Sequence, residues 1–308
     1  MATFYAPTAI DLSRLPAPSA IEALDFESLY DGFEDRFLFY WNALRADNPS
    51  LPEYDVVTLK SDPAGILGEA WSYIRLLDRQ RVNDALKALL APLATGSNLD
   101  AIAASRNITR LTVISATANT AAVMESDTNL LRRYLLSFDK AAAGSRDRYL
   151  YEAWTAWPAM HDARVNGHAV HGRRGDTDVV IIGPGGRLPT EGETATVRAA
   201  VTAPHVKPEA VAVAVIPATR LEYSVAIVIE VPPGPDPSLV VAEAVARVRA
   251  AGDARMIIGG EVPAGLLSGA AYGSSVIKVR DLAPVAISPD PYTIPILTNI
   301  NITAEVRT

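Results

Sequence analysis

The residues that could carry out catalysis are few and widely spaced. The histidines are His161, His168, His171 and His205, and no two have the His-Glu-x-x-His spacing of a helical zinc site. His168 and His171 lie three residues apart in a stretch typical of extended chain or a turn, so their side chains diverge. The chain contains no cysteine, which excludes a disulfide scaffold, a thiolate metal site and a cysteine nucleophile. We therefore expect no catalytic site, no metal site and no bound cofactor.

Two glycine-rich stretches approach known enzyme motifs without matching them. The first, Gly183–Gly186, follows a predicted strand, but Leu188 stands where the third glycine of Gly-x-Gly-x-x-Gly belongs, and the proline in the stretch removes one N–H donor. In the second, Gly265–Gly269, Ser268 comes one place too late for Gly-x-Ser-x-Gly. Both patterns are typical of turns. The alternative is a cytosolic α+β enzyme of unknown reaction that uses Ser268, His205 or the Gly183–Gly186 loop.

The composition narrows the classes of partner. Lysine and arginine number 28 against 35 aspartates and glutamates, a formal net charge of −7, whereas nucleic-acid binding needs clustered positive charge. No apolar run reaches the ~18–20 residues of a membrane-spanning helix, and residues 1–13 lack the pattern of a secretory signal. We expect neither nucleic acid nor membrane as a partner. Hydrophobic residues make up 49% of the chain, enough for a packed core.

The most distinctive element is an aromatic helix predicted over residues 26–44. Asp25 precedes it, and its apolar positions follow one helical stripe. Proline-containing segments on both sides, with breaks near residues 18 and 49, allow the helix to project from the body. Two interpretations stay open: the stripe packs within the protein's own helical domain, or it docks into a partner's helical bundle. The stripe consists of Phe26, Leu29, Tyr30, Phe33, Phe37, Tyr40, Trp41 and Leu44.

A second long helix is predicted over residues 66–90. Ser61-Asp62-Pro63 supplies a cap followed by proline in the first turn. Its charged residues lie mostly off the apolar stripe. They form either a buried ionic network or surface pairs three and four residues apart, and we favour surface or interface ion pairs. We assign Arg75, Arg79 and Arg81 to a candidate partner interface, together with the aromatic stripe. Its apolar stripe consists of Leu67, Ala70, Trp71, Ile74, Leu77, Val82, Ala85, Leu86 and Leu89.

The periodicity changes after Pro158. Shorter helices are expected at 98–106 and within 125–157. Beyond them, β-branched and apolar runs predict strands separated by further helices. The fold class is α+β: an N-terminal helical arm and helical domain followed by small mixed α/β sheet domains, elongated and multidomain. The expected strands are 178–182, 210–216, 224–231, 276–279 and 296–306, with helices at 193–203 and 238–251.

Four parts are expected along the chain. Residues 1–59 form an extended arm and the aromatic helix for partner docking, and residues 60–160 form a helical domain. An α/β domain then covers residues 161–231, and a second one with a C-terminal strand covers residues 232–308.

Several motifs, in order along the chain, resemble one family. The chain is similar to baseplate assembly protein J of contractile-tailed bacteriophages over most of residues 11–216, whereas residues after 232 match only in general layout. Gly175-Asp176-Thr177 stands where the family often has Pro-Gly. The matching stretches are Leu15-Pro16-x-Pro18, Leu24–Glu27, Arg79–Ala85, Ala94–Asp100, Arg110, Glu125–Asp127, Leu131-Arg132, Ala143–Ser145, Tyr149, Val197-Arg198 and Val206–Pro208.

The resemblance implies a structural subunit of the baseplate wedge rather than an enzyme. It implies that the chain pairs with a second copy of itself and with an I-type wedge protein through helical segments. Its other domains would link wedges into a six-fold ring around the hub, beside a sheath-proximal wedge protein. The implied location is the virion tail baseplate, after assembly in the cytoplasm of the bacterial host, where the absence of cysteine is expected.

Overall fold

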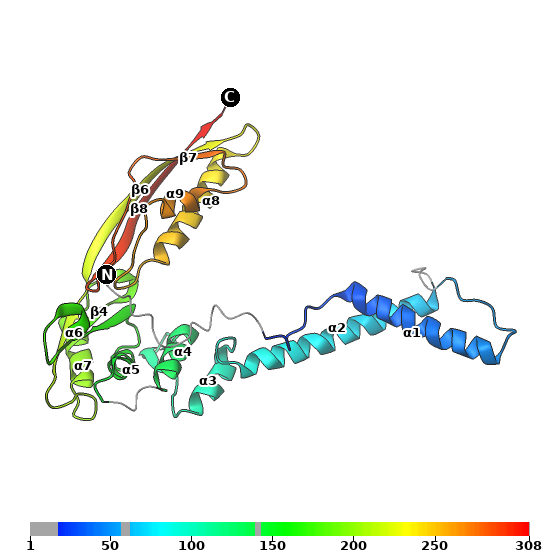
Figure 1. Cartoon of the computed structure of the whole chain (residues 1–308), viewed down its shortest axis with the longest axis horizontal. Coiled ribbons are helices and arrows are strands. Elements are labelled where there is room, and N and C mark those ends of the chain that lie inside the picture. The colour runs from blue at the N-terminus through cyan, green and yellow to red at the C-terminus, as the bar shows by residue number, and fades with distance from the viewer. Residues whose placement is uncertain (1–17, 57–61, 139–142, 308) are drawn as a thin grey trace. The chain divides into compact units, whose positions relative to one another are not determined.

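A computed structural model describes residues 18–56, 62–138 and 143–307, and the chain divides into two compact units. Unit 1 covers residues 1–109 and unit 2 covers residues 110–308 (Figure 1). The extended arm predicted for residues 1–20 lies outside the described residues except for its last three, as does the predicted boundary after residue 59.

Unit 1 is helical, as the sequence predicts. Its elements are α1 (Phe26–Asp47), α2 (Pro63–Leu89) and α3 (Gly96–Ala104). Local caps set where the two long helices begin: the Asp25 carboxylate accepts the Ser28 N–H at 3.1 Å, and the Asp62 carboxylate accepts the Ala64 N–H at 2.9 Å. Pro63 occupies the first turn of α2, where its missing N–H costs nothing.

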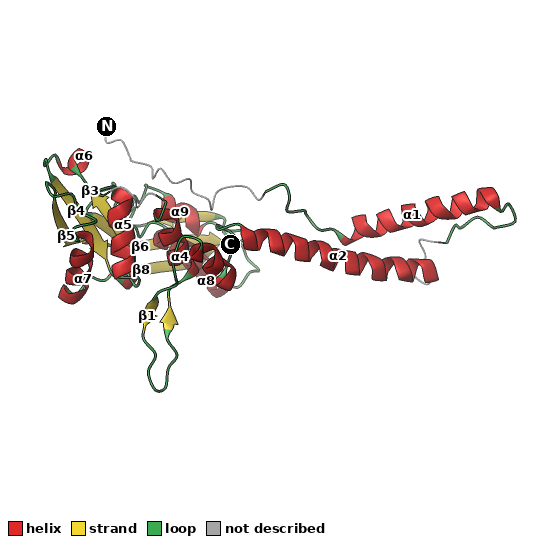
Figure 2. Ribbon diagram, turned by 90° about the horizontal axis from the view of Figure 1, so that it is seen from below, coloured by secondary structure: helices red, strands yellow, loops and turns green. Residues whose placement is uncertain are grey.

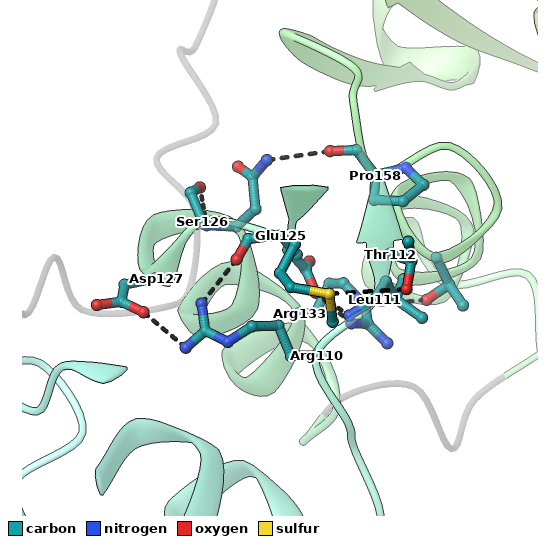
Figure 3. Close-up of polar contacts among 11 residues, drawn as sticks. Arg110, Leu111, Thr112, Glu125, Ser126, Asp127, Arg133 and Pro158 are labelled. Carbon is teal, nitrogen blue, oxygen red and sulfur yellow. Dashed lines mark hydrogen bonds and ion pairs between the residues drawn. The ribbon is translucent and has the colours of Figure 1, made fainter. Parts of the chain in front are cut away.

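Unit 2 begins with a small hairpin and two helices. Arg110 donates to the Glu125 carbonyl and to the Asp127 carboxylate, both at 2.6 Å, and so joins the two ends of the hairpin (Figure 3). Figure 2 shows the hairpin extending away from α4. These elements are β1 (Thr112–Ile114), β2 (Val123–Met124), α4 (Asp127–Leu136) and α5 (Arg146–Ala156).

The first larger sheet has the order β3-β4-β5, with β3 antiparallel and β5 parallel to the central β4. Tyr149 and Trp154 of α5 and Val197 of α7 are buried in one core with Val179 and Ile181 of β4. The elements are β3 (Asp162–Asn166), α6 (His168–His171), β4 (Asp176–Ile182), a 3₁₀ turn (Pro184–Gly186), α7 (Glu191–Val201) and β5 (Ala212–Pro217).

The second sheet has the order β7-β6-β8, with β7 antiparallel and β8 parallel to β6. Helices α8 and α9 pack on it, and its core includes Ile227, Val248 and Ile302. The elements are β6 (Thr219–Val231), α8 (Pro237–Asp253), α9 (Leu266–Ala271), β7 (Lys278–Asp281) and β8 (Thr293–Val306).

The two sheets are joined by a shared core and a polar contact. Ile182 of the first sheet and Ile294 of the second are both fully buried in that core. The Asp162 carboxylate accepts the Ile258 N–H at 2.8 Å, and Arg164 donates to the Ile258 carbonyl at 3.2 Å. Desolvation raises the pKa of Asp162, although the Ile258 hydrogen bond opposes that shift. The joint therefore fixes the two sheets as one body within unit 2.

The structure differs from the sequence-based division in three places. The boundary between the two units, after residue 109, falls inside the predicted helical domain. Helix α5 packs against α7 and β3, so it belongs with the first sheet rather than with a helical domain of residues 60–160. Strand β6 pairs with β7 and β8, so it belongs to the second sheet rather than to residues 161–231. The strands predicted in unit 2 are present within a few residues, but β1, β2 and β3 were not predicted, because short runs that contain polar residues lack a clear period. The mixed α+β class is confirmed.

The ionisation of the Glu193 carboxyl, at the start of α7, can be tested. The Thr190 hydroxyl accepts the Glu193 N–H at 3.2 Å, and the Glu193 carboxylate accepts the Thr190 N–H at 2.8 Å, which together form a capping box. Arg187 also donates to this carboxylate at 2.8 Å. These hydrogen bonds, that from Arg187 first, lower the pKa of Glu193 to about 2.

We expect the Glu193 carboxyl to titrate near pH 2 in a carbon-detected NMR titration. Because the folded-state pKa is lowered, its stabilisation of α7 is present above the unfolded pKa of about 4.3 and is lost as pH falls toward 2. Arg187→Ala should move the midpoint upward. A midpoint at the ordinary value in the unmodified protein would contradict the capping arrangement.

Candidate partner-docking surface

Helices α1 and α2 form a hairpin (Figure 2). Aromatic side chains pack between the two helices. The Phe33 ring lies 5.9 Å from the Trp71 ring, centroid to centroid. Phe33 also covers Gly68, where an added Cβ would lie 2.5 Å from a Phe33 ring carbon. The glycine therefore allows the two helices to approach closely.

The segment between the helices covers the other end of the aromatic stripe. Tyr54 lies 4.8 Å from Phe37 and 5.1 Å from Trp41, measured between ring centroids, in both cases edge-on. The Trp41 indole N–H donates to the Pro52 carbonyl at 3.1 Å, and the Tyr54 hydroxyl donates to the Asp62 carboxylate at 2.7 Å. Part of the stripe is thus used inside unit 1.

None of the stripe residues is fully buried. Tyr40 and Leu44 are exposed, by 66% and 50%. A groove of about 390 Å³ runs along this end of α1 and is lined by Phe33, Arg36, Phe37, Tyr40, Trp41 and Leu44. The remaining stripe residues, Phe26, Leu29 and Tyr30, are half-buried. The stripe therefore has both an internal side and an accessible side.

The three predicted interface arginines have different surroundings. Arg79 lies 3.2 Å from the Glu22 carboxylate, so it holds the extended segment before α1. Asn83 binds the same segment by accepting the Glu22 N–H at 3.1 Å and donating to the Glu22 carbonyl at 2.8 Å. Arg75 is exposed beside a cavity of about 740 Å³ between α1 and α2, and Arg81 is exposed on α2. Arg79 thus acts within the chain, whereas Arg75 and Arg81 are accessible.

A further accessible apolar surface lies on α2, outside the predicted interface set. The side of α2 that faces the rest of unit 1 buries small or polar residues, among them Gly68, Ser72 and Asn83. We call the opposite side the outer face of α2; it consists of Ile66, Leu67, Tyr73, Ile74 and Leu77, which are exposed by 53%, 66%, 57%, 59% and 46%. The signal in the sequence was the three- and four-residue spacing of positions 67, 70, 74 and 77, which is typical of a helix–helix seam.

We expect Gly68→Val to separate α1 from α2. The added side chain would occupy the space of the Phe33 ring, and overpacking of this kind costs about 1–3 kcal/mol. The measurement is the fluorescence of Trp71, which should shift toward that of a solvent-exposed indole. Gly32→Val is the matched control, because nothing lies within 4 Å of a Cβ at Gly32. Equal effects of both variants would contradict the close approach at Gly68.

The residues of the alternative enzyme hypothesis lie on separate elements of unit 2. The Ser268 hydroxyl in α9 donates to the Gly265 carbonyl at 3.3 Å, and His205 is exposed in the loop after α7. In the Gly183–Gly186 turn, the Gly183 N–H donates to the Arg187 carbonyl at 2.9 Å. Among the described residues, no group of three or more potential ligands could hold a metal ion, and no helix is both long and apolar enough to cross a membrane.

Comparisons with known proteins agree with the motif resemblance. Residues 60–117 match the Baseplate J-like N-terminal domain family, a range that includes α2 and its outer face. The chain is 32% identical to Baseplate protein J of Escherichia phage P2 over 282 residues, which cover 90% of this chain and 91% of that protein. The chain therefore belongs to the baseplate protein J family, the structural proteins of the phage tail baseplate.

Proposed function

We propose that the chain is a wedge subunit of a contractile tail baseplate and that unit 1 is its docking element. It pairs there with a second copy of itself and with an I-type wedge protein. Unit 2 links neighbouring wedges into a six-fold ring around the hub and beside the sheath-proximal wedge protein. Its contribution is structural, without a reaction of its own.

The outer face of α2 carries this proposal. Five large apolar side chains on one side of one helix, each about half exposed or more, form a patch that unit 1 itself does not cover. Apolar residues at three- and four-residue spacing pack into the grooves of a partner helix. Helical segments of other subunits are therefore the occupants that fit this face.

Charged residues continue the same helical line. After Leu77, the next two positions of the seam are Arg81 and Asp84, both exposed. Polar residues in a helix seam fix register and partner choice at a cost in stability. An apolar patch followed by a polar end suits a contact that must be specific and must also be released when the baseplate changes state.

The exposed aromatic end of α1 offers a second contact for the same bundle. Tyr40 and Leu44 line its groove with the accessible edges of Phe37 and Trp41. These residues and Arg75 and Arg81 keep the docking role assigned to them, whereas Arg79 supports the surface from within by holding Glu22. Phe33 and Tyr30 act by packing α1 against Gly68 of α2, and Phe26 and Leu29 keep the docking role assigned to them.

Oxidative footprinting of the assembled tail tests the proposal. Tyr73, Ile74 and Leu77 should react readily with hydroxyl radicals in the purified chain and lose most of that reactivity in intact particles. Ser72, buried within unit 1, and its half-buried neighbour Leu76 give the internal reference on the same helix. Unchanged reactivity of the outer face in particles would refute docking there.

A further inference from the structure

Strand β8 has one edge that the fold leaves open. The Arg307 N–H donates to the Val231 carbonyl, which gives the hydrogen-bonding direction of β8 toward β6 for the part of the strand after the bulge opposite Tyr223 and Ser224. Since this direction alternates along a strand, the N–H and C=O groups of residues 301, 303 and 305 point toward β6. Those of Ile300, Ile302, Ala304 and Val306 point away from β6, and no other strand pairs with that edge among the described residues.

The open edge lacks the usual features that prevent strand pairing. Native edge strands are commonly protected by proline, by inward-pointing charge or by a bulge. Residues 300–306 contain no proline, and the bulge in the β6–β8 pairing lies earlier, opposite Tyr223 and Ser224. The charged residue Glu305 points to the polar face, where it pairs with Arg280 of β7 across the sheet. Such an edge is a template for another strand.

We propose that β8 pairs with β8 of a second copy, antiparallel, with Thr303 opposite Thr303 on a two-fold axis. In this register Ile302 faces Ala304 of the second copy and Ile300 faces its Val306. All four residues present outward N–H and C=O groups, so the pairing forms about eight backbone hydrogen bonds. The result is a continuous sheet that runs through both copies, with β8 and its counterpart at the centre.

Strand β8 is suited to pairing with β8 of a second copy, because one face of the strand is apolar and the other is polar. Ile302 is buried in the core below the sheet, and Ile300 and Ala304 are packed against that core. Asn301 and Thr303 are exposed on the other face. Antiparallel pairing places the apolar residues of both copies on one face and their polar residues on the other. An isologous contact of this kind closes on itself and does not extend into a fibre.

Helix α8 packs against β8, with Val248 in the same core as Ile302. Its Arg249 donates to the Leu297 carbonyl at 2.8 Å, at a position before the unpaired residues 300–306 of the edge. The same side of the helix carries Val245, Ala242 and Ser238, at four, seven and eleven residues before Arg249. Ala242 and Ser238 are exposed and Val245 is half-buried. These small side chains would meet α8 of the second copy beneath the joined sheet.

This proposal rests on the proposed function only in that copies of the chain meet in the assembly. The edge of β8 is a different surface from the outer face of α2. A single cysteine reports on it, since the chain contains none. In the full chain with Thr303→Cys, the two sulfur-bearing residues would face each other at a Cα separation of about 4.5 Å, within disulfide range. We expect a covalent dimer under mild oxidation, seen after denaturation without reductant.

Asn301→Cys is the matched control, on the same face of the same strand. Across the axis its two copies would be separated by four residues, roughly 13 Å along the strand, so no disulfide should form. Thr303→Cys should give the same cross-link when the outer face of α2 is also disrupted, which separates failure of this proposal from failure of helical docking. Equal yields at positions 301 and 303 would overturn the proposal, as would an adduct of the Thr303→Cys chain with another protein only.

A backbone variant tests the hydrogen bonds themselves. Ala304→Pro in the Thr303→Cys chain removes an N–H that points away from β6, so the β6–β8 ladder stays intact. We expect the covalent dimer to fall at least tenfold, while Ala304→Val, which keeps the N–H, retains it. Circular dichroism confirms that both variants are folded. A proline variant that is folded and cross-links normally would also overturn the proposal.

Discussion

Replacing Ile74 and Leu77 together by aspartate is expected to remove the chain from assembled tails. Both side chains are about half exposed in the free chain and would be buried by a docked helix. Burial of such a side chain contributes about 1.5–3 kcal/mol, and each aspartate adds the cost of desolvating a charge. The affinity should fall by at least about 100-fold. Quantitative mass spectrometry of purified particles measures how much of the chain is incorporated.

The control for this variant places the same charges elsewhere on the same helix. Val82 and Leu89 are exposed and lie to one side of the outer face, so Val82→Asp with Leu89→Asp should leave incorporation unchanged. Circular dichroism should show native helix content for both double variants. Normal incorporation of the first variant would contradict docking through α2, and a loss of its helix content would mean that the face belongs to the protein's own core.

Most of the helices were predictable because their signals are local. The short helix α6 was not: the expectation of extended chain or a turn at His168 and His171 is wrong, since both lie in this helix. Asp25 and Asp62 cap α1 and α2 through hydrogen bonds that span only two or three residues, and Thr190 does the same for α7. The long strands were equally visible, because β4 and β6 are rich in β-branched residues. Strand β3 was not visible: it reads Asp-Ala-Arg-Val-Asn, and its Asp162 and Arg164 contact Ile258, which is distant in sequence.

The proposed docking surface was predictable only in part, because a helix with two apolar sides does not reveal which one faces its own chain. The sequence leaves the aromatic stripe of α1 open between internal packing and docking. In the structure Phe33 packs on Trp71, whereas Tyr40 is exposed and stays available to a partner. Which side of α2 faces α1 depends on the close approach of Phe33 to Gly68, two residues that are 35 positions apart in the sequence. No periodicity within either helix contains that information.

The second large effect is expected at the root of the β1–β2 hairpin, in the variant Glu125→Ala. Glu125 is 2% exposed and its carboxylate accepts from Arg133, itself 3% exposed, at 2.7 Å (Figure 3). The same carboxylate accepts the Leu111 N–H at 3.2 Å. Removing one partner of a buried ion pair costs about 3–5 kcal/mol, because the other charge stays desolvated. Since a domain is stable by only about 5–15 kcal/mol, urea denaturation of the full chain should show a large loss for unit 2.

Two further variants distinguish the free-energy cost of leaving the Arg133 charge unpaired from the cost of removing the Glu125 side chain. Glu125→Leu with Arg133→Met replaces both charges by apolar groups of similar size, and we expect it to recover most of the stability that the alanine variant loses. Glu222→Ala removes the partner of Arg220 in an ion pair that is 2.8 Å long and largely exposed, and it should change the stability by less than about 1 kcal/mol. If Glu125→Ala and Glu222→Ala had equal effects, the root of the hairpin would be held by its backbone alone. A large loss for the alanine variant with recovery in the apolar double variant would instead establish that the buried Arg133 needs a carboxylate beside it.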